Sequence, residues 1–112
     1  MKYMLLIHHD EEALAKLDWK AIAAEYAAFN EALAKVGNPG ERLQPSSMAT
    51  SVRIRNGKTD VLDGPYAETK EQFAGYFTVD VPDLHQAIAW AARCPSVRYG
   101  TIEVRPLAQS GS

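Results

Sequence analysis

The sequence predicts an α+β fold, in which one antiparallel sheet carries two helices on one of its faces. Three observations predict it. Residues 3–7 form a short, wholly apolar run that is typical of a strand buried on both faces. Two later segments repeat apolar residues at helical spacing. Between them, residues 49–64 contain Asn56-Gly57, a strong hairpin signal because both residues tolerate a positive φ.

The first long helix is predicted to begin after Asp18, which can accept the free amide hydrogens of a helix start. A short helical turn is expected before it, over residues 11–17. The helix is indicated by apolar residues at steps of four, three, four and three, namely Ile22, Tyr26, Phe29, Leu33 and Val36. Gly37 is expected to end the helix as its C′ residue. Residues 37–47 contain two prolines and are predicted to form a loop.

The second helix is predicted after a strand at residues 73–81. Asp83 and Gln86 resemble a capping box at its start. Its apolar stripe consists of Leu84, Ala87, Ile88 and Ala91. Pro95 is expected to stop it.

The last strand is predicted over residues 97–106. Its apolar side chains, Ile102 and Val104, face one way, and its polar ones face the other, namely Thr101, Glu103 and Arg105. The resulting order is strand, helix, antiparallel strands, helix, strand, which is typical of a ferredoxin-like α+β domain.

A second copy of the chain is the expected cover for the sheet face without helices. In the first strand Tyr3, Leu5 and Ile7 lie on one side, and Met4 and Leu6 lie on the other. Both sets are apolar, although the helices can cover only one of them. The sequence therefore predicts a homodimer.

The composition fits one domain at residues 1–108, followed by a polar tail at 109–112. Hydrophobic residues make up 46% of the chain and charged residues 23%, so a core without metal or disulfide is feasible. The net charge of −2 argues against direct nucleic-acid binding, which needs a concentrated basic face. The single cysteine and the short N-terminal apolar run predict a cytoplasmic protein without a membrane span.

A resemblance to a known family is carried by four segments, which read KYMLLIHHDE, TDVLDGPYAETKEQFAGYFTVDVPDL, AIAWAARCP and RYGTIEVRP. Together they resemble the YCII-related family, and more narrowly its subgroup named for an Asp-Gly-Pro-Phe motif. The motif stands here as Asp63, Gly64, Pro65 and Tyr66, with tyrosine in place of phenylalanine. The resemblance implies a ferredoxin-like dimer whose sheets pack face to face as an α+β barrel. It also implies a sigma-factor association, because some relatives are encoded beside alternative sigma factors or fused to them.

The resemblance does not extend to the chemistry of the broader family. That family includes a lyase that eliminates HCl from a chlorinated aromatic with a His–Asp pair. Tyr26 and Cys94 stand here at the positions of the histidine and the aspartate. Both side chains are mostly protonated at neutral pH, so they do not replace a general base. The lyase chemistry is therefore not expected to carry over, which favours a protein without catalysis over an enzyme.

The stretch VLDGPYAETKEQFAGYF, residues 61–77, is longer than an ordinary strand connection. One interpretation is a rigid turn at Gly64 and Pro65, with Asp63 accepting backbone amides in an Asx-turn. The other is a small-molecule pocket between this loop, the first helix and the barrel interior. Its expected residues are Tyr26, Asp63, Tyr66, Glu68, Lys70 and Glu71. Lys70 would supply a cation for an anionic or aromatic ligand.

No metal site and no cofactor are predicted. His8 and His9 are neighbours on a strand, so their side chains should point to opposite faces and cannot share one ion. Two function classes remain. The first is a dimeric ligand-binding or accessory protein without chemistry of its own. The second is a small-molecule lyase or isomerase that acts in the barrel interior.

Overall fold

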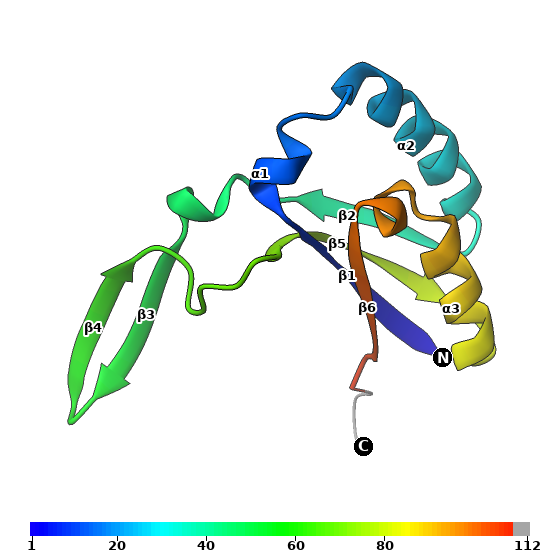
Figure 1. Ribbon diagram of the computed structural model, residues 1–112. Helices are drawn as coiled ribbons and strands as arrows, with labels where there is room; N and C mark the ends of the chain where they lie inside the picture. The colour runs from blue at the N-terminus through cyan, green and yellow to red at the C-terminus, as the bar shows by residue number, and fades with distance from the viewer. Residues whose placement is uncertain (109–112) are drawn as a thin grey trace.

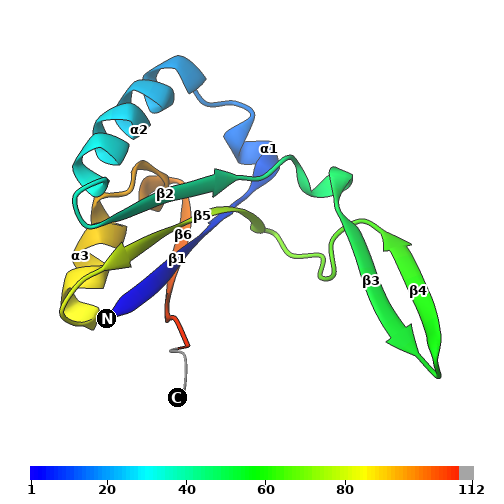
Figure 2. The ribbon, with the colours of Figure 1, turned by 180° about the vertical axis from the view of Figure 1, so that it is seen from behind.

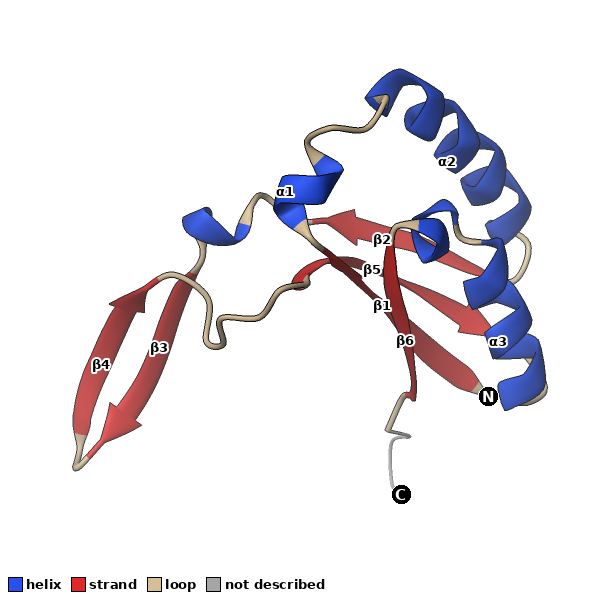
Figure 3. Ribbon diagram, in the orientation of Figure 1, coloured by secondary structure: helices blue, strands red, loops and turns tan. Residues whose placement is uncertain are grey.

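The computed structural model describes residues 1–108 and has an α+β fold with antiparallel sheets (Figure 3). The larger sheet has the order β2-β5-β1-β6, and its strands are β1 (Lys2–His9), β2 (Gly37–Arg42), β5 (Gln72–Asp80) and β6 (Gly100–Pro106). A separate hairpin consists of β3 (Thr50–Arg55) and β4 (Lys58–Asp63). The described α-helices are α1 (Glu11–Leu14), α2 (Trp19–Leu33) and α3 (Leu84–Arg93). Two 3₁₀ turns are η1 (Ser46–Met48) and η2 (Pro95–Arg98).

The helices form one layer over the larger sheet. Figure 1 shows α2 and α3 on the same side of β2, β5, β1 and β6, with η2 between them and the sheet edge. No described helix covers the opposite face of this sheet. Figure 2 shows the hairpin of β3 and β4 as an arm that projects well away from the body. The sheet therefore has one face inside the domain and one face that the described chain leaves open.

The core lies between the helices and the sheet, as the alternation in β1 predicts. Tyr3, Leu5 and Ile7 are buried, whereas Met4 and Leu6 are half-buried on the opposite face. The buried partners of the first set come from α2, β5 and α3, and include Phe29, Leu33, Phe77, Val79, Ala87 and Ala91. The prediction of two apolar faces on this strand is confirmed.

The start of α2 is as predicted, but its end is not. Asp18 Oδ1 accepts the amide hydrogens of Lys20 and Ala21 at 3.1 and 3.3 Å. The prediction that Gly37 is the C′ residue is wrong, because α2 ends at Leu33 and Gly37 is the first residue of β2. A glycine is needed there for a different reason, since a Cβ atom at this position would run into the backbone of β5.

The prediction of a loop over residues 37–47 is wrong for its first half. Residues 37–42 are the edge strand β2, which pairs with β5 through Gly37–Val79 and Asn38–Thr78 before the register shifts. Pro39 and Gly40 resemble loop residues, but a proline is tolerated on an edge strand. Gly40 has a φ of +66° and lies where the pairing register between β2 and β5 shifts, so it permits this irregularity in the strand. Pairing with β5, rather than strand propensity, makes this segment extended.

The hairpin is confirmed as a local structure. Asn56 and Gly57 have φ values of 50° and 75°, which a tight turn of this kind requires. The expectation that its strands belong to the main sheet is wrong, since β3 and β4 pair with each other in a sheet of their own. Strand signals in a sequence show that a segment is extended, but they do not show which edge it pairs with.

Helix α3, the second of the two predicted long helices, turns a different face to the core than its predicted apolar stripe. Ala87 and Ala91 are buried, but Leu84 and Ile88 are half exposed, so these two are wrongly assigned to the core. The small alanines let α3 approach the sheet closely, and Trp90 packs against Phe29 with ring centroids 6.0 Å apart. The Asp83 cap is confirmed, since its carboxylate accepts the Gln86 amide hydrogen at 3.0 Å.

The C-terminal strand starts later than predicted, at Gly100, because Pro95–Arg98 form the turn η2. Its alternation is confirmed: Ile102 and Val104 pack against the core. No helix of the described chain is long and apolar enough to cross a membrane. The predicted tail at 109–112 lies outside the described residues.

Candidate functional site

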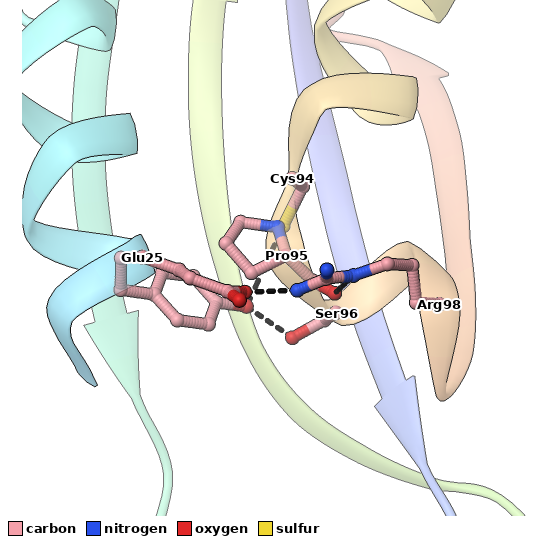
Figure 4. Close-up of polar contacts among 6 residues, drawn as sticks. Glu25, Cys94, Pro95, Ser96 and Arg98 are labelled. Carbon is pink, nitrogen blue, oxygen red and sulfur yellow. Dashed lines mark hydrogen bonds and ion pairs between the residues drawn. The ribbon is translucent and has the colours of Figure 1, made fainter. Parts of the chain in front are cut away.

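A cluster of polar groups joins α2 to η2. The Tyr26 hydroxyl lies 3.4 Å from Cys94 Sγ and also hydrogen bonds to the Ser96 hydroxyl. Cys94 and Ser96 are buried, and Tyr26 is partly buried. Figure 4 shows Cys94 and Ser96 beside Glu25 and Arg98, which form an ion pair between the same two elements. Tyr26 and Cys94, which the family resemblance matches to the His–Asp pair, therefore lie in contact.

Tyr26 and Cys94 are not proton acceptors at neutral pH. Burial, followed by the hydrogen bond with Cys94, raises the pKa of Tyr26 well above its ordinary value. Burial likewise raises the pKa of the Cys94 thiol. Both groups keep their protons at pH 7, so they can hold a ligand or each other but cannot act as a general base.

A cavity of about 730 Å³ lies beside this cluster, under α2. Side chains from α1, α2, β1, β2 and β5 line it. Its apolar and aromatic walls include Ile7, Leu14, Trp19, Ile22, Phe29 and Phe77. Tyr26 and Ser96 border it, and so do His9 and Tyr99. A cavity of this volume with apolar walls and a few polar groups has the character of a small-molecule pocket.

His9 is the polar residue that the sequence reasoning did not assign to a pocket. The prediction that His8 and His9 point to opposite faces is confirmed: His9 lies on the helix side and is 8% exposed, while His8 lies on the open face. Within residues 1–108, neither ring nitrogen of His9 has a hydrogen-bond partner, and the same holds for the buried Tyr99 hydroxyl. The strand alternation that buries Ile7 could have identified His9, because it is a histidine in phase with the core residues.

Burial is the main cause that lowers the pKa of His9 from its ordinary value of 6.5. The positive charge of Arg42 lowers this pKa further, and so does His8, while Glu71 acts in the opposite direction. At pH 7 the imidazole is therefore neutral and presents one N–H donor and one bare nitrogen acceptor.

The Asp-Gly-Pro-Tyr turn lies at the base of the projecting hairpin, and it is held by the backbone. The Gly64 amide donates to the Ala49 carbonyl at 2.7 Å, and the Ser51 hydroxyl donates to the Gly64 carbonyl at 2.9 Å. Gly64 has a φ of +101°, in the region that favours glycine. The predicted Asx-turn is wrong, because the Asp63 side chain is exposed and makes no hydrogen bond within the described residues. The side-chain contact that holds the turn is instead the Ser51 hydroxyl, which donates to a carbonyl rather than accepting an amide hydrogen.

A second groove of about 1090 Å³, more open than the cavity under α2, lies between this loop and the open face of the sheet. Tyr66 and Glu71 contribute to it. Glu71 accepts the Thr101 hydroxyl at 2.6 Å, and His8 Nε2 lies 3.1 Å from a Glu103 carboxylate oxygen, so the sheet side of this groove is polar.

The residues predicted for one pocket are divided by the structure. Tyr26 borders the cavity under α2, whereas Tyr66 and Glu71 line the groove on the other side of the sheet. Asp63, Glu68 and Lys70 are exposed and line neither space. One copy of the chain does not bring the six together. No group of three or more His, Cys, Asp or Glu side chains in residues 1–108 is arranged to hold a metal ion.

Comparison with known proteins defines the class. Residues 1–110 match the YCII-related domain, so the chain belongs to the YCII-related family. A relative from Rhizobium meliloti (strain 1021), the uncharacterized protein R00369, is 34% identical over 115 residues. The match covers 96% of this chain and 93% of the relative, whose name assigns it no activity.

Proposed function

We propose that this chain is a small-molecule-binding protein without catalysis of its own, and that its ligand occupies the cavity under α2. The observation that carries the proposal is the nine-tenths buried His9, which borders this cavity and whose two ring nitrogens have no hydrogen-bond partner in the described residues. Buried polar groups in folded proteins are nearly always hydrogen bonded. A bound molecule would supply the partner.

A non-catalytic role is supported by the groups beside the cavity. Tyr26 and Cys94 keep their protons at neutral pH, and they bond to each other rather than projecting freely toward a substrate. The loop residues Glu68 and Lys70 lie elsewhere, so Tyr26 is the one predicted pocket residue that we keep in the proposed site.

The proposal is tested by a thermal-shift screen with metabolites on the full chain. A ligand at about one hundred times its dissociation constant stabilises the folded state by about 2.7 kcal/mol. Ala23→Trp places a large side chain where Ala23 lines the cavity, and Ala24→Trp is the matched control on a residue that lines neither space. Shifts that disappear with Ala23→Trp and persist with Ala24→Trp support the cavity. Shifts that survive both changes would place the ligand elsewhere.

A lyase or isomerase that acts in the same cavity is the second candidate. The observation that favours it is His9 itself, because a neutral imidazole in an apolar cavity is able to accept a proton from a substrate. Turnover of a ligand found in the screen, lost in His9→Gln while binding persists, would favour this candidate over the first.

The proposed assembly is a homodimer of ferredoxin-like domains whose sheets pack face to face as an α+β barrel. Met4, Leu6 and Tyr76 give the open face an apolar centre. On the arm, Val52 and Val61 are paired across the strands and are exposed. An isolated two-stranded hairpin is marginally stable in water, so a covering surface from a second copy supports both features.

We also propose that the chain belongs to a particular subgroup of the YCII-related family. Asp63, Gly64, Pro65 and Tyr66 support membership of the Asp-Gly-Pro-Phe subgroup. An association with an alternative sigma factor follows from that subgroup by resemblance, and a cytoplasmic location is supported by the single cysteine of the chain. Co-purification of the tagged chain with the sigma factors of its host tests the association, and recovery of none of them would count against it.

A further inference from the structure

We infer that the cavity under α2 takes a small, planar, uncharged molecule with a hydrogen-bond donor and an acceptor on one edge, which His9 and Tyr99 contact. This inference rests on the proposed function and names the chemical class of its ligand. It depends on three properties of the cavity: its buried polar atoms, its charge and its walls.

The polar atoms come from two elements that lie next to each other. His9 is the last residue of β1, and Tyr99 follows η2 directly. Their ring centroids lie 6.3 Å apart with the rings tilted by 53°. Both residues border the cavity, and their buried ring nitrogens and hydroxyl have no partner among residues 1–108. Since the two rings are neighbours on the cavity lining, one small molecule can contact both side chains.

The hydrogen-bonding capacity of this pair sets what the ligand must offer. A neutral imidazole has a bare nitrogen that accepts, and a phenol hydroxyl can donate. A ligand with an N–H or O–H group beside a carbonyl oxygen matches them, because it donates to His9 and accepts from Tyr99. A purely apolar molecule would leave these groups unpaired.

The surrounding charges disfavour an ion. His9 carries no charge at neutral pH, because burial and the positive charge of Arg42 oppose its protonation. The Arg42 guanidinium lies 4.8 Å from the centre of the Trp19 ring and is exposed, so it stacks at the rim of the cavity. Two carboxylates also line the cavity: Glu41 is exposed, and the half-buried Glu11 accepts the Ser46 amide hydrogen at 3.0 Å. Arg98 lies 5.6 Å from the centre of the Tyr99 ring, but it is exposed and paired with Glu25. An ion of either sign would therefore lose its hydration beside the neutral His9 without gaining a buried partner of opposite charge. Glu71 and His8 act on His9 from the other side of the strand.

The walls favour a flat, largely apolar body. Ile7, Leu14 and Ile22 are aliphatic, and Trp19, Phe29 and Phe77 are aromatic. Aromatic side chains pack well against planar rings in offset or edge-to-face arrangements. The volume of about 730 Å³ leaves room for a molecule larger than a single ring.

The test uses four probes that share one ring and differ in their polar group: benzamide, benzoate, benzylamine and toluene. Their binding to the full chain is measured by protein NMR titration at neutral pH, where affinities of roughly millimolar are expected for molecules of this size. We expect benzamide to bind about tenfold more tightly than the other three, since it alone pairs both groups. Its perturbed resonances should be those of residues that line the cavity.

Tyr99→Phe removes the hydroxyl while it keeps the ring, and it should weaken benzamide about tenfold and leave toluene unchanged. Tyr66→Phe is the matched control at an 88% exposed tyrosine. Equal or tighter binding of benzoate, equal binding of toluene, or no binding of benzamide in the cavity would each overturn the inference. The proposed function is judged separately: a charged metabolite whose thermal shift is lost in Ala23→Trp would retain it while removing this ligand class.

Discussion

Tyr26 and Cys94 are 68 positions apart in the sequence, and their side chains lie 3.4 Å apart in the structure, between Oη and Sγ. The family resemblance places these two residues where the broader family has a His–Asp pair. The chain thus brings the two positions together and fills them with groups that keep their protons at pH 7.

The Tyr26 hydroxyl should contribute to stability. Tyr26→Phe leaves the buried Ser96 hydroxyl with one partner fewer, so we expect a loss of about 1 kcal/mol in the free energy of unfolding. In a domain of this size that lowers the melting temperature by roughly 4–8 °C. Calorimetry of Tyr26→Phe checks this, with the exposed Tyr66→Phe as control. Equal melting of the two variants would show that the hydroxyl contributes nothing net.

Dehydrochlorination should be absent. Assayed against chlorinated hydroxyquinone-type substrates, the wild-type chain should release no chloride, because Tyr26 and Cys94 cannot take up a proton at neutral pH. Chloride release is followed directly in solution. If turnover occurs and Tyr26→Phe abolishes it, the tyrosine is an acid–base residue and our interpretation of the pair is wrong.

His9 should make stability depend on pH. Its pKa is lowered from 6.5 in the folded chain, so the unfolded chain binds more protons between that lowered value and 6.5. The contribution of neutral His9 is fully present above pH 6.5 and is lost as the pH falls through this window. Urea denaturation of His9→Gln should show a shallower decline than wild type below about pH 6.5.

The exposed His85→Gln is the matched control for this pH series, and it should follow the wild-type curve. The titratable groups distant from His9 are present in all three proteins, so their titration cancels in the comparison. The same decline in all three would mean that the folded state does not oppose protonation of His9.

The fold could be predicted from the sequence where a pattern is local. The Asp18 and Asp83 caps, the Asn56-Gly57 turn and the alternation in β1 depend on neighbours within a few residues, and the structure has them as predicted. The edge strand at Gly37–Arg42 could not be predicted, because its extended form depends on pairing with β5, 33 to 42 positions away.

The site was harder to predict for the same reason. The charged loop residues Glu68 and Lys70 were predicted to line a pocket because charges are dense in this stretch of the sequence, yet both side chains are exposed. His9 follows the apolar run of residues 3–7, and its importance depends on its burial on the helix side of the sheet and on Tyr99, 90 positions further on. Folding brings His9 and Tyr99 together, but their spacing in the sequence does not indicate this contact.

Leu6 should lie at the centre of the dimer interface. Light scattering at low micromolar concentration should give twice the chain mass, and Leu6→Glu should shift it to one chain mass, because the glutamate would be buried between two sheets. Ile88→Glu is the control, since Ile88 is exposed on α3 in the helix layer. A wild-type monomer at this concentration would remove the barrel.

The turn at the base of the arm should be held by Ser51 and Gly64 rather than by Asp63. The Ser51 hydroxyl donates to the Gly64 carbonyl at 2.9 Å, whereas the exposed Asp63 carboxylate makes no hydrogen bond in the described chain. Ser51→Ala should therefore speed amide exchange in residues 49–64 by about fivefold, the effect of one hydrogen bond near 1 kcal/mol. Gly64→Ala should do so as well, because its φ of +101° strains any side chain.

Asp63→Ala and Lys70→Ala are the controls, and they should leave exchange in the arm unchanged. All four variants should melt close to wild type, because the arm lies outside the core. Exchange measured by mass spectrometry on peptides from the arm and from β1 separates the local effect from the global one. Faster exchange in Asp63→Ala, with Ser51→Ala unaffected, would restore the carboxylate as the anchor of the turn.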